Sequence, residues 1–251
     1  MHIASSESVL DGRRACLALG MFDGVHRGHQ ALLRACVSHA AAHHTPSYVY
    51  TYPNAPHPEK MQRVGGVLTT ARQKLRLCAE MGFTGAIMQA FTDAYAAQTP
   101  EAFVHMLCQR ARTLAMFCGA NYRFGRYGRG DAALLKALCA PYGTSVYVVQ
   151  DVAYADALIS STRVREALLL GDCKLAHSLL GRPYEIEPVF QNGRAAWTEN
   201  ARLRPGRYLC RLARQKRCVD VAQDGTLDIQ DGRSLTGTYA VAFLQRAADA
   251  T

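Results

Sequence analysis

Two hydrophobic patterns alternate along most of the chain. Short apolar runs of the kind that form buried strands occur at residues 15–20, 47–52, 84–90, 114–118 and 145–149. Apolar residues at helical spacing lie between these runs, after residue 28, before Gly82, after Thr99, and over residues 131–139 and 160–170. Strands that alternate with helices predict an α/β fold with a doubly wound parallel sheet, in which the loops after the strands share one crevice.

The pattern changes after Leu180. Short β-rich segments separated by Gly, Asp or Asn follow at residues 184–190, 206–213, 217–222, 225–231 and 237–245. This spacing predicts a small antiparallel β domain. We therefore expect two domains, residues 1–180 and residues 181–251.

The composition indicates a folded, globular protein. Hydrophobic residues make up 49% of the 251 residues and charged residues 20%, so the chain can bury a core. The sequence has no apolar run near the roughly 18 residues of a membrane span and no signal-peptide pattern at its start. Nine cysteines occur without a CxxC pair, which argues against a disulfide scaffold or zinc ribbon. We expect a cytoplasmic protein with no membrane partner.

The net charge of the chain does not identify its binding partner. A net charge of +9 attracts polyanions such as nucleic acid, an acidic membrane or a phosphorylated small molecule. An arginine-rich, solvated surface would carry the same charge without any such partner.

A first motif, GMFDGVHRGH, joins the first predicted strand to the first predicted helix at residues 20–29. Free N–H groups at a helix N-terminus attract phosphate, and Gly28 lets a ligand approach the backbone. His26 and His29 lie three positions apart and so project to similar sides, where protonated rings would stabilise charge on phosphates. The alternatives are two surface histidines beside a turn, or a zinc pair, which lacks a recognisable third ligand.

A second motif, ISSTRVR, opens the predicted helix at residues 159–165. One hydroxyl is enough to cap a helix, yet Ser160, Ser161 and Thr162 stand together here. Arg163 and Arg165 oppose the helix dipole unless an anion binds there, so we expect a second phosphate-binding terminus. An ordinary cap remains the alternative.

A third motif, FCGANYRFGRYGRGD, follows the strand at 114–118. It combines aromatic rings for stacking, the amide of Asn121 for hydrogen bonds to a ring, and several arginines. An RNA-binding loop or a solvated basic turn would have the same composition.

A fourth segment, TYPNAPHP, follows the strand at residues 47–52. Three prolines stiffen it, which suits the wall of a substrate pocket but also an inert connection.

Taken together, these motifs closely resemble the adenylyltransferase module of bacterial FAD synthetases, the bifunctional riboflavin kinase/FMN adenylyltransferase family. The likeness rests on FDGVHRGHQALL, on GANYRFG with GRGD, and on ISSTRVREALLLGD followed by AHSLLGRPY, and it covers about residues 16–184. HxGH and ISSTxxR occur across the wider nucleotidyltransferase superfamily, whereas the other blocks are specific to the flavin branch.

The resemblance implies a Rossmann-like domain of the HxGH nucleotidyltransferase type and transfer of AMP from Mg-ATP to FMN, giving FAD and pyrophosphate. It implies no side-chain nucleophile. The catalytic residues by this likeness are His26, His29, Ser160, Thr162 and Arg165. The same residues bind ATP together with Gly20, Phe22, Asp23, Gly28 and Ser161. The FMN-binding residues are Pro56, His57, Pro58, Asn121, Tyr122, Arg123, Phe124 and Arg126.

The expected small-molecule partners are ATP, which arrives with Mg²⁺, and FMN. No residue is assigned to the metal, and we expect neither a nucleic-acid partner nor an obligate protein partner.

Two segments depart from the family pattern. TYPNAPHP replaces TFxPHP, which puts flavin contacts at that loop in doubt. The kinase signature GFPTAN corresponds to residues 196–200, where Thr198 and Asn200 remain but Trp197 replaces the proline.

The kinase module is also shortened. From Ala201 to the end the sequence contains no glutamate to act as the base, and Asp220, Asp224 or Asp228 would have to substitute for it. We therefore expect the riboflavin kinase activity to be lost. The alternatives are a compact bifunctional enzyme, an HxGH transferase acting on phosphopantetheine or nicotinate mononucleotide, and a non-catalytic RNA- or flavin-binding protein.

Overall fold

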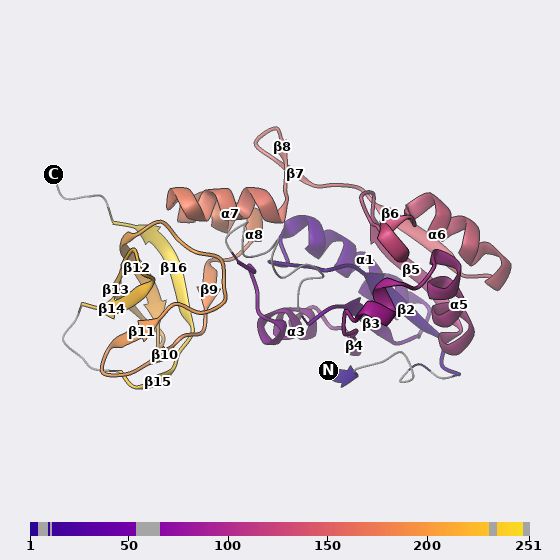
Figure 1. The fold of residues 1–251 in the computed structure, drawn as a ribbon, viewed down its shortest axis with the longest axis horizontal. Coiled ribbons are helices and arrows are strands. Elements are labelled where there is room, and N and C mark those ends of the chain that lie inside the picture. Colours follow the sequence, from indigo (N-terminus) through magenta and orange to yellow (C-terminus); the bar gives the residue numbers. More distant parts are fainter. Residues whose placement is uncertain (5–9, 11, 54–65, 231–234, 248–251) are drawn as a thin grey trace. The chain divides into compact units, whose positions relative to one another are not determined.

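The structure, a computed structural model, describes residues 1–4, 10, 12–53, 66–230 and 235–247 (Figure 1). The chain forms two compact units, each described here by itself. The N-terminal unit consists of Met1–Pro58 and Ala71–Val152, and the C-terminal unit of Glu59–Thr70 and Ala153–Thr251. The segment Glu59–Thr70, which separates the two parts of the N-terminal unit in the sequence, therefore belongs to the C-terminal unit.

A parallel sheet is the centre of the N-terminal unit. Its strands among the described residues are β1 (His2–Ala4), β2 (Ala15–Leu19), β3 (Ser47–Thr51), β4 (Gly85–Met88), β5 (Thr113–Gly119) and β6 (Ser145–Val149). They pair in the order β1-β4-β3-β2-β5-β6. Five of the six coincide with the apolar runs of the sequence. The exception, β1, has only three residues, too few to form a recognisable pattern.

Helices cover both faces of this sheet (Figure 1). They are α1 (Arg27–Ala42), α3 (Ala71–Glu80), α4 (Asp93–Ala96), α5 (Pro100–Ala111) and α6 (Ala132–Cys139). Side chains of a strand alternate between the faces, so Leu17 and Leu19 join one hydrophobic cluster with helix α5, while Cys16 and Ala18 join another with α1. Two separate cores on the two faces confirm the predicted doubly wound α/β architecture.

The strand order reverses between β2 and β5. From β2 the chain continues to β3 and β4 on one side, and it later returns to β5 and β6 on the other. In such sheets the ligand crevice lies outside the carboxyl ends of the two strands at this switch point. The loops after β2 and β5 carry the first and third motifs of the sequence, so both motifs lie at this switch point of the sheet.

The described residues of the C-terminal unit form an antiparallel sheet and two helices. The helices are α7 (Ser161–Leu170) and α8 (Cys173–Leu180), preceded by a hairpin of β7 (Ala153–Tyr154) and β8 (Ala157–Leu158). The main sheet among the described residues contains β9 (Tyr184–Ile186), β11 (Arg194–Ala196), β12 (Gly206–Leu212), β13 (Gln215–Val221), β14 (Thr226–Ile229) and β16 (Val241–Arg246). A further pair joins β10 (Val189–Phe190) to β15 (Gly237–Thr238). The antiparallel C-terminal β structure predicted from the sequence is thereby confirmed.

Helices α7 and α8 belong to the same compact unit as this sheet. Their buried residues include Leu168 and Leu179, and the N–H of Arg204 donates to the carbonyl of Leu168 at 3.0 Å. The predicted boundary near Gly181 marks the change from helices to strands, and as a division between functional modules it stays a prediction.

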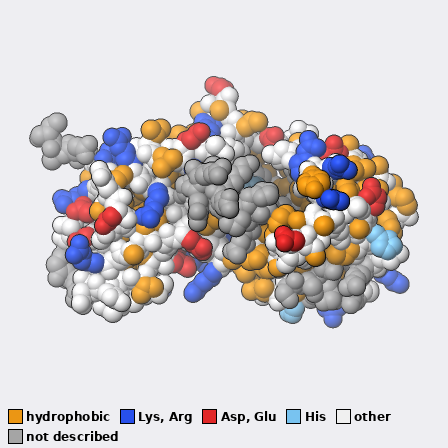
Figure 2. Space-filling view, viewed as in Figure 1, with side chains coloured by type: hydrophobic (Ala, Val, Ile, Leu, Met, Phe, Trp, Pro, Cys, Tyr) orange, Lys and Arg blue, Asp and Glu red, His pale blue; other side chains and the backbone are white. Residues whose placement is uncertain are grey.

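The surface and the thiols bear on the candidate partners. Lys and Arg side chains are scattered over the face shown in Figure 2 rather than gathered in one patch. All nine cysteines have free thiols; eight are buried and Cys218 is exposed. Among the helices that the structure describes, none combines the length and apolarity required to span a bilayer.

Candidate active site

The loop between β2 and α1 is tightly formed by its own buried residues. Phe22 and Val25 have φ values of 51° and 42°, and both side chains are buried. A positive φ is unfavourable for non-glycine residues, above all for a β-branched one, and persists only where packing enforces it. Gly20 contributes to this packing because a Cβ there would lie 2.8 Å from the Phe22 ring. The loop is therefore rigid before any ligand binds.

His26 and His29 lie directly against each other at the start of α1. His26 is the N-cap, and its Nδ1 accepts the N–H of His29 at 3.3 Å. The two rings stack with centroids 3.6 Å apart, and the His29 ring meets the edge of Phe22 at 5.4 Å. The structure thus brings the two predicted histidines together on one side of the helix.

His29 carries a buried nitrogen with an unused hydrogen-bonding capacity. Its Nδ1 has no hydrogen-bond partner among the described residues. Burial, the adjacent His26 and the charge of Lys74 hold the pKa of His29 well below its usual range. The first turn of α1 contains no acidic residue. A neutral, unpartnered imidazole at a positive helix end is suited to an anion, because an anion would favour its protonation.

Lys74 is a functional candidate that the sequence analysis missed. It is 5% exposed on α3, and its ammonium donates to the Tyr52 carbonyl at 2.9 Å and to Thr51 Oγ1 at 3.3 Å. Thr51 in turn donates to the carbonyl of Met21 at 3.1 Å, which ties the lysine to the histidine loop. Burial lowers the pKa of Lys74 to about 8, although the carboxylate of Asp23 opposes this shift. The available signal was a lysine on the same helical face as buried apolar residues.

The loop after β5 is anchored to the core by one of its aromatic rings. Phe124 is buried, packs against Phe103 with ring centroids 5.2 Å apart, and bridges to Gly130 through two backbone hydrogen bonds. Tyr122 is half-buried and stacks on Phe124 at 5.7 Å. Packing therefore accounts for Phe124, and its proposed contact with FMN stays a prediction.

The polar residues of this loop face solvent. Asn121, Arg123 and Arg126 are exposed. Arg123 lies 3.8 Å from the carboxylate of Asp131, and the Arg126 guanidinium lies 4.9 Å from the centre of the Tyr127 ring. These side chains are accessible to a ligand at this edge of the sheet. The other predicted flavin contacts, Pro56, His57 and Pro58, lie outside the described residues.

The ISSTRVR motif lies in the C-terminal unit. Ser160 is the N-cap of α7 and accepts the N–H of Arg163 at 3.2 Å, which is the ordinary cap that the sequence analysis left as the alternative. Arg163 donates to the carbonyls of Tyr154 and Ala157, both at 2.8 Å, and so holds the β7–β8 hairpin. These bonds account for Arg163 without an anion.

The other hydroxyls and Arg165 differ in accessibility. Ser161 is half-buried and Thr162 is exposed, whereas Arg165 is buried and donates from Nε to the carbonyl of Gly66 at 2.9 Å. The motif and the paired histidines belong to different units, so their convergence on one ATP molecule stays a prediction.

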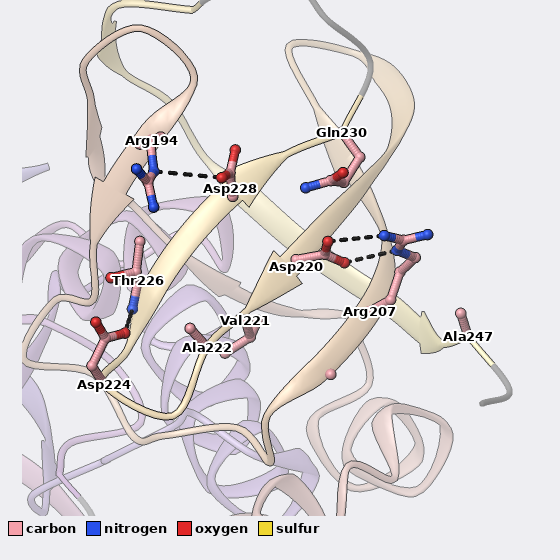
Figure 3. Close-up of a pocket in the computed structure, with 11 residues that line it drawn as sticks. Arg194, Arg207, Asp220, Val221, Ala222, Asp224, Thr226, Asp228, Gln230 and Ala247 are labelled. Atoms are coloured by element: carbon pink, nitrogen blue, oxygen red, sulfur yellow. Dashed lines mark hydrogen bonds and ion pairs between the residues drawn. The ribbon is translucent and has the colours of Figure 1, made fainter. Parts of the chain in front are cut away.

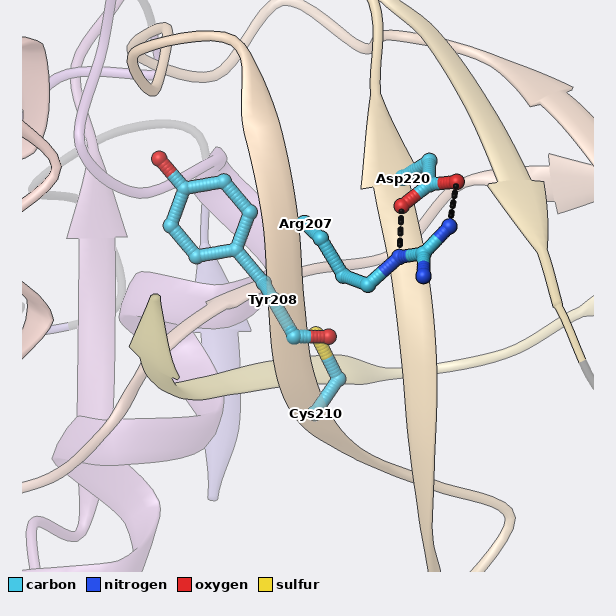
Figure 4. Close-up of polar contacts among 4 residues, drawn as sticks. All are labelled: Arg207, Tyr208, Cys210 and Asp220. Atoms are coloured by element: carbon cyan, nitrogen blue, oxygen red, sulfur yellow. Dashed lines mark hydrogen bonds and ion pairs between the residues drawn. The ribbon is translucent and has the colours of Figure 1, made fainter. Parts of the chain in front are cut away.

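A pocket on the C-terminal sheet holds the three aspartates considered as kinase bases (Figure 3). Asp228 pairs with Arg194 at 3.4 Å. Asp220 receives two hydrogen bonds from Arg207 across the neighbouring strands β12 and β13, at 2.8 and 3.0 Å (Figure 4). Asp224 accepts the N–H of Thr226 at 2.7 Å, which lowers the pKa of that carboxyl. Each aspartate is therefore engaged with a neighbouring residue.

The described residues contain no group of three or more His, Cys, Asp or Glu side chains placed to hold a metal ion. The donors at the histidine site are nitrogens, which suit phosphate oxygens rather than Mg²⁺.

The sequence of the chain matches those of known proteins. The sequence profile of the FAD synthetase family matches residues 10–163. A Listeria monocytogenes protein named FAD synthetase is 32% identical over 187 residues, which span 73% of this chain and 75% of that protein. The Escherichia coli K12 protein named bifunctional riboflavin kinase/FMN adenylyltransferase is 34% identical over 174 residues, 68% of this chain and 55% of that one.

The fold also has a counterpart among solved structures. A crystal structure from Streptococcus pneumoniae, titled a macrolide-efflux protein, superposes with a TM-score of 0.82 at 24% identity and covers 99% of this chain and 91% of the other. That likeness concerns the fold alone. The profile match and the identity to the Listeria protein establish the family: the chain belongs to the FAD synthetase family.

Proposed function

We propose that the protein is an FMN adenylyltransferase, which transfers AMP from ATP to FMN and releases FAD and pyrophosphate. The observation that carries the proposal is the stacked histidine pair, in which the buried Nδ1 of His29 has no partner among the described residues. In a family of FAD synthetases, a site of this kind beside the sheet's switch point suits the phosphates of ATP.

The reaction needs positioning and charge stabilisation rather than a protein nucleophile. An oxygen of the FMN phosphate attacks the α-phosphorus of ATP, a new P–O bond forms, and the bond to pyrophosphate breaks. The attacking oxygen is already anionic, so no base has to remove a proton. His26 and His29 would donate to the phosphate oxygens as charge moves to the leaving pyrophosphate.

The remaining contacts complete the proposed site. Gly20, Phe22, Asp23 and Gly28 shape the loop beneath the phosphates, and Ser160, Ser161, Thr162 and Arg165 would bind ATP from the C-terminal unit. Mg²⁺ would arrive bound to ATP and offset the charge of its phosphates. FMN would lie near the exposed Asn121, Arg123 and Arg126 and the half-buried Tyr122.

We further propose that the chain does not phosphorylate riboflavin. A kinase base must accept the proton of the riboflavin hydroxyl. Asp220 and Asp228 are paired with arginines, and Asp224 accepts the N–H of Thr226, so each carboxylate is already engaged by a neighbouring residue of the chain. The division between residues 1–180 and residues 181–251 is proposed to separate the active module from this reduced one.

The decisive experiment incubates the purified protein with Mg-ATP and either FMN or riboflavin, and separates the flavins by chromatography. We expect FAD from FMN and no product from riboflavin. FMN or FAD from riboflavin would show that the kinase survives. If neither flavin reacts, the proposal is wrong, and binding of RNA that weakens steeply with salt becomes the next test.

Replacement of His29 by alanine tests the assigned role directly. We expect FAD formation to fall by about 10²–10³-fold, the usual loss when one preorganised donor is removed from a site of developing charge. His43→Ala is the matched control, because His43 is exposed at the other end of the same helix. A loss below threefold for His29→Ala would exclude the role.

A further inference from the structure

The segment at residues 66–68 is docked against residues 197–201 within the C-terminal unit. Val67 and Asn200 form a parallel β-bridge, and the N–H of Ala201 donates to the carbonyl of Val67 at 2.6 Å. Gly66 has a φ of +100°, and a Cβ there would lie 2.9 Å from the carbonyl oxygen of Glu199. Only glycine fits this close backbone approach. The pairing of residues 66–68 with residues 197–201 therefore requires glycine at position 66.

Thr198 and Asn200 support this dock with their side chains. The Thr198 hydroxyl lies 2.6 Å from Asn200 Oδ1, which leaves the amide Nδ2 to donate to the Leu68 carbonyl at 3.4 Å. Asn200 is 2% exposed, and its own carbonyl accepts the indole N–H of Trp197 at 2.9 Å. These are the residues that correspond to the kinase signature, yet here their polar groups bond to the chain itself.

The other end of the docked segment holds a residue of the proposed ATP site. The carbonyl of Gly66 accepts Nε of Arg165 at 2.9 Å, and the Arg165 side chain is buried. A buried guanidinium keeps one orientation only if its acceptors are fixed. The acceptor here belongs to a loop segment that is anchored two residues later by Asn200.

We propose that Thr198 and Asn200 are positioning residues for Arg165, which they orient through residues 66–68. The proposal rests on the proposed function of Arg165 in binding ATP. It also gives the reduced C-terminal module a role in adenylyl transfer. Thr198 and Asn200 correspond to kinase residues that help to bind Mg-ATP. Here they would instead orient the Arg165 guanidinium in the proposed adenylyl-transfer site.

The test is a double-mutant cycle between Asn200 and Arg165. Asn200→Asp keeps the shape of the side chain but places a carboxylate against the Leu68 carbonyl. We expect kcat/KM for ATP to fall about tenfold to a hundredfold, the scale of a misplaced binding group. In an Arg165→Ala background the same change should cost less than about twofold. Thr198→Val, which removes only the hydroxyl, should behave in the same way with a smaller loss.

Two controls separate positioning from general destabilisation. Asn192→Asp makes the same chemical change on an exposed turn of the same unit and should leave kcat/KM unchanged. Thermal unfolding should show that each variant is still folded at the assay temperature, so that the change in kcat/KM is measured on folded enzyme.

The outcomes distinguish this inference from the proposed function. If wild type makes FAD and the losses of the two variants multiply, Asn200 has only a structural role and the inference is overturned. If wild type makes no FAD from FMN, the proposed function fails and the inference fails with it. If wild type makes FAD from FMN and the losses in kcat/KM of the two variants are non-additive while the variants stay folded, both the proposed function and the inference are supported.

Discussion

At the scale of single residues, the candidate site contains two basic side chains whose charged forms are disfavoured by burial. Burial lowers the pKa of Lys74 to about 8 and that of His29 well below 6.5. A shift of this size means that burying the charged lysine costs about 3 kcal/mol at neutral pH. Such a cost at the ligand crevice is typical of functional residues. An incoming polyphosphate would favour both charged forms.

Lys74 predicts a specific dependence of stability on pH. The folded pKa lies below the unfolded value of 10.5, so the unfolded chain binds more protons between about pH 8 and 10.5, and stability rises with pH there. Relative to Lys74→Met, wild type should gain about 2 kcal/mol of unfolding free energy between pH 8 and 9.5. Urea unfolding at both pH values measures this difference. An equal change in unfolding free energy between the two pH values for wild type and Lys74→Met would contradict the lowered pKa of Lys74.

Sequence motifs predicted the paired histidines but not Lys74. The pair stands out because HxGH follows a strand and opens a helix. Lys74 does not, since a lysine on an apolar helical face has the same pattern whether its ammonium reaches solvent or turns inward. The aromatic residues after β5 show the same limit: Phe124 is buried and Tyr127 is 80% exposed, although both occur in one similar stretch.

At the scale of elements, the β2–α1 loop shows how local strain supports a site. Phe22 and Val25 keep positive φ values because both side chains are buried, and Gly20 leaves room for the Phe22 ring. The ring of His29 rests against that of Phe22. A change in the packing of Phe22 should therefore move the histidine.

Gly20→Ala tests this connection. The new Cβ would displace the Phe22 ring, and we expect KM for ATP to rise about tenfold, together with a loss of about 1–3 kcal/mol of stability from overpacking. Gly143→Ala is the control: its φ is +67° and no atom lies near its Cβ position, so it should lose stability with no change in KM. Equal KM values for the two variants would show that displacing the Phe22 ring does not affect His29.

The elements themselves were largely predictable. The strands β2 to β5 appear as apolar runs because they are buried in the middle of the parallel sheet. The edge strand β6 is also apolar, although most of its residues are exposed. The pairing of residues 66–68 with residues 197–201 was not predictable. Hydrophobic periodicity predicts local structure. This contact instead joins two loop segments largely through backbone N–H and C=O groups, which leave no pattern in the sequence.

At the scale of the whole molecule, the stability of α7, which the ISSTRVR motif opens, and of α8 depends on packing within the C-terminal unit. Helix α8 buries Cys173, Ala176, Leu179 and Leu180, and α7 receives a hydrogen bond from Arg204. A chain ending at residue 180 would leave these groups exposed and remove the support of residues 66–68. We expect such a chain to aggregate or to lose FAD formation, with α7 and α8 unprotected in hydrogen exchange. A soluble, fully active chain of residues 1–180 would contradict this dependence.

The docked segment also has a consequence for biosynthesis. Leu68 and its partner Asn200 are 132 positions apart, and translation at roughly 5–20 residues per second separates their appearance by about ten seconds. During that interval the carbonyl of Leu68 lacks the hydrogen bond from Asn200. Arg165 also emerges from the ribosome before its orienting carbonyl is anchored. The surroundings of Arg165 would thus mature only after Asn200 has left the ribosome, although Arg165 itself is made earlier.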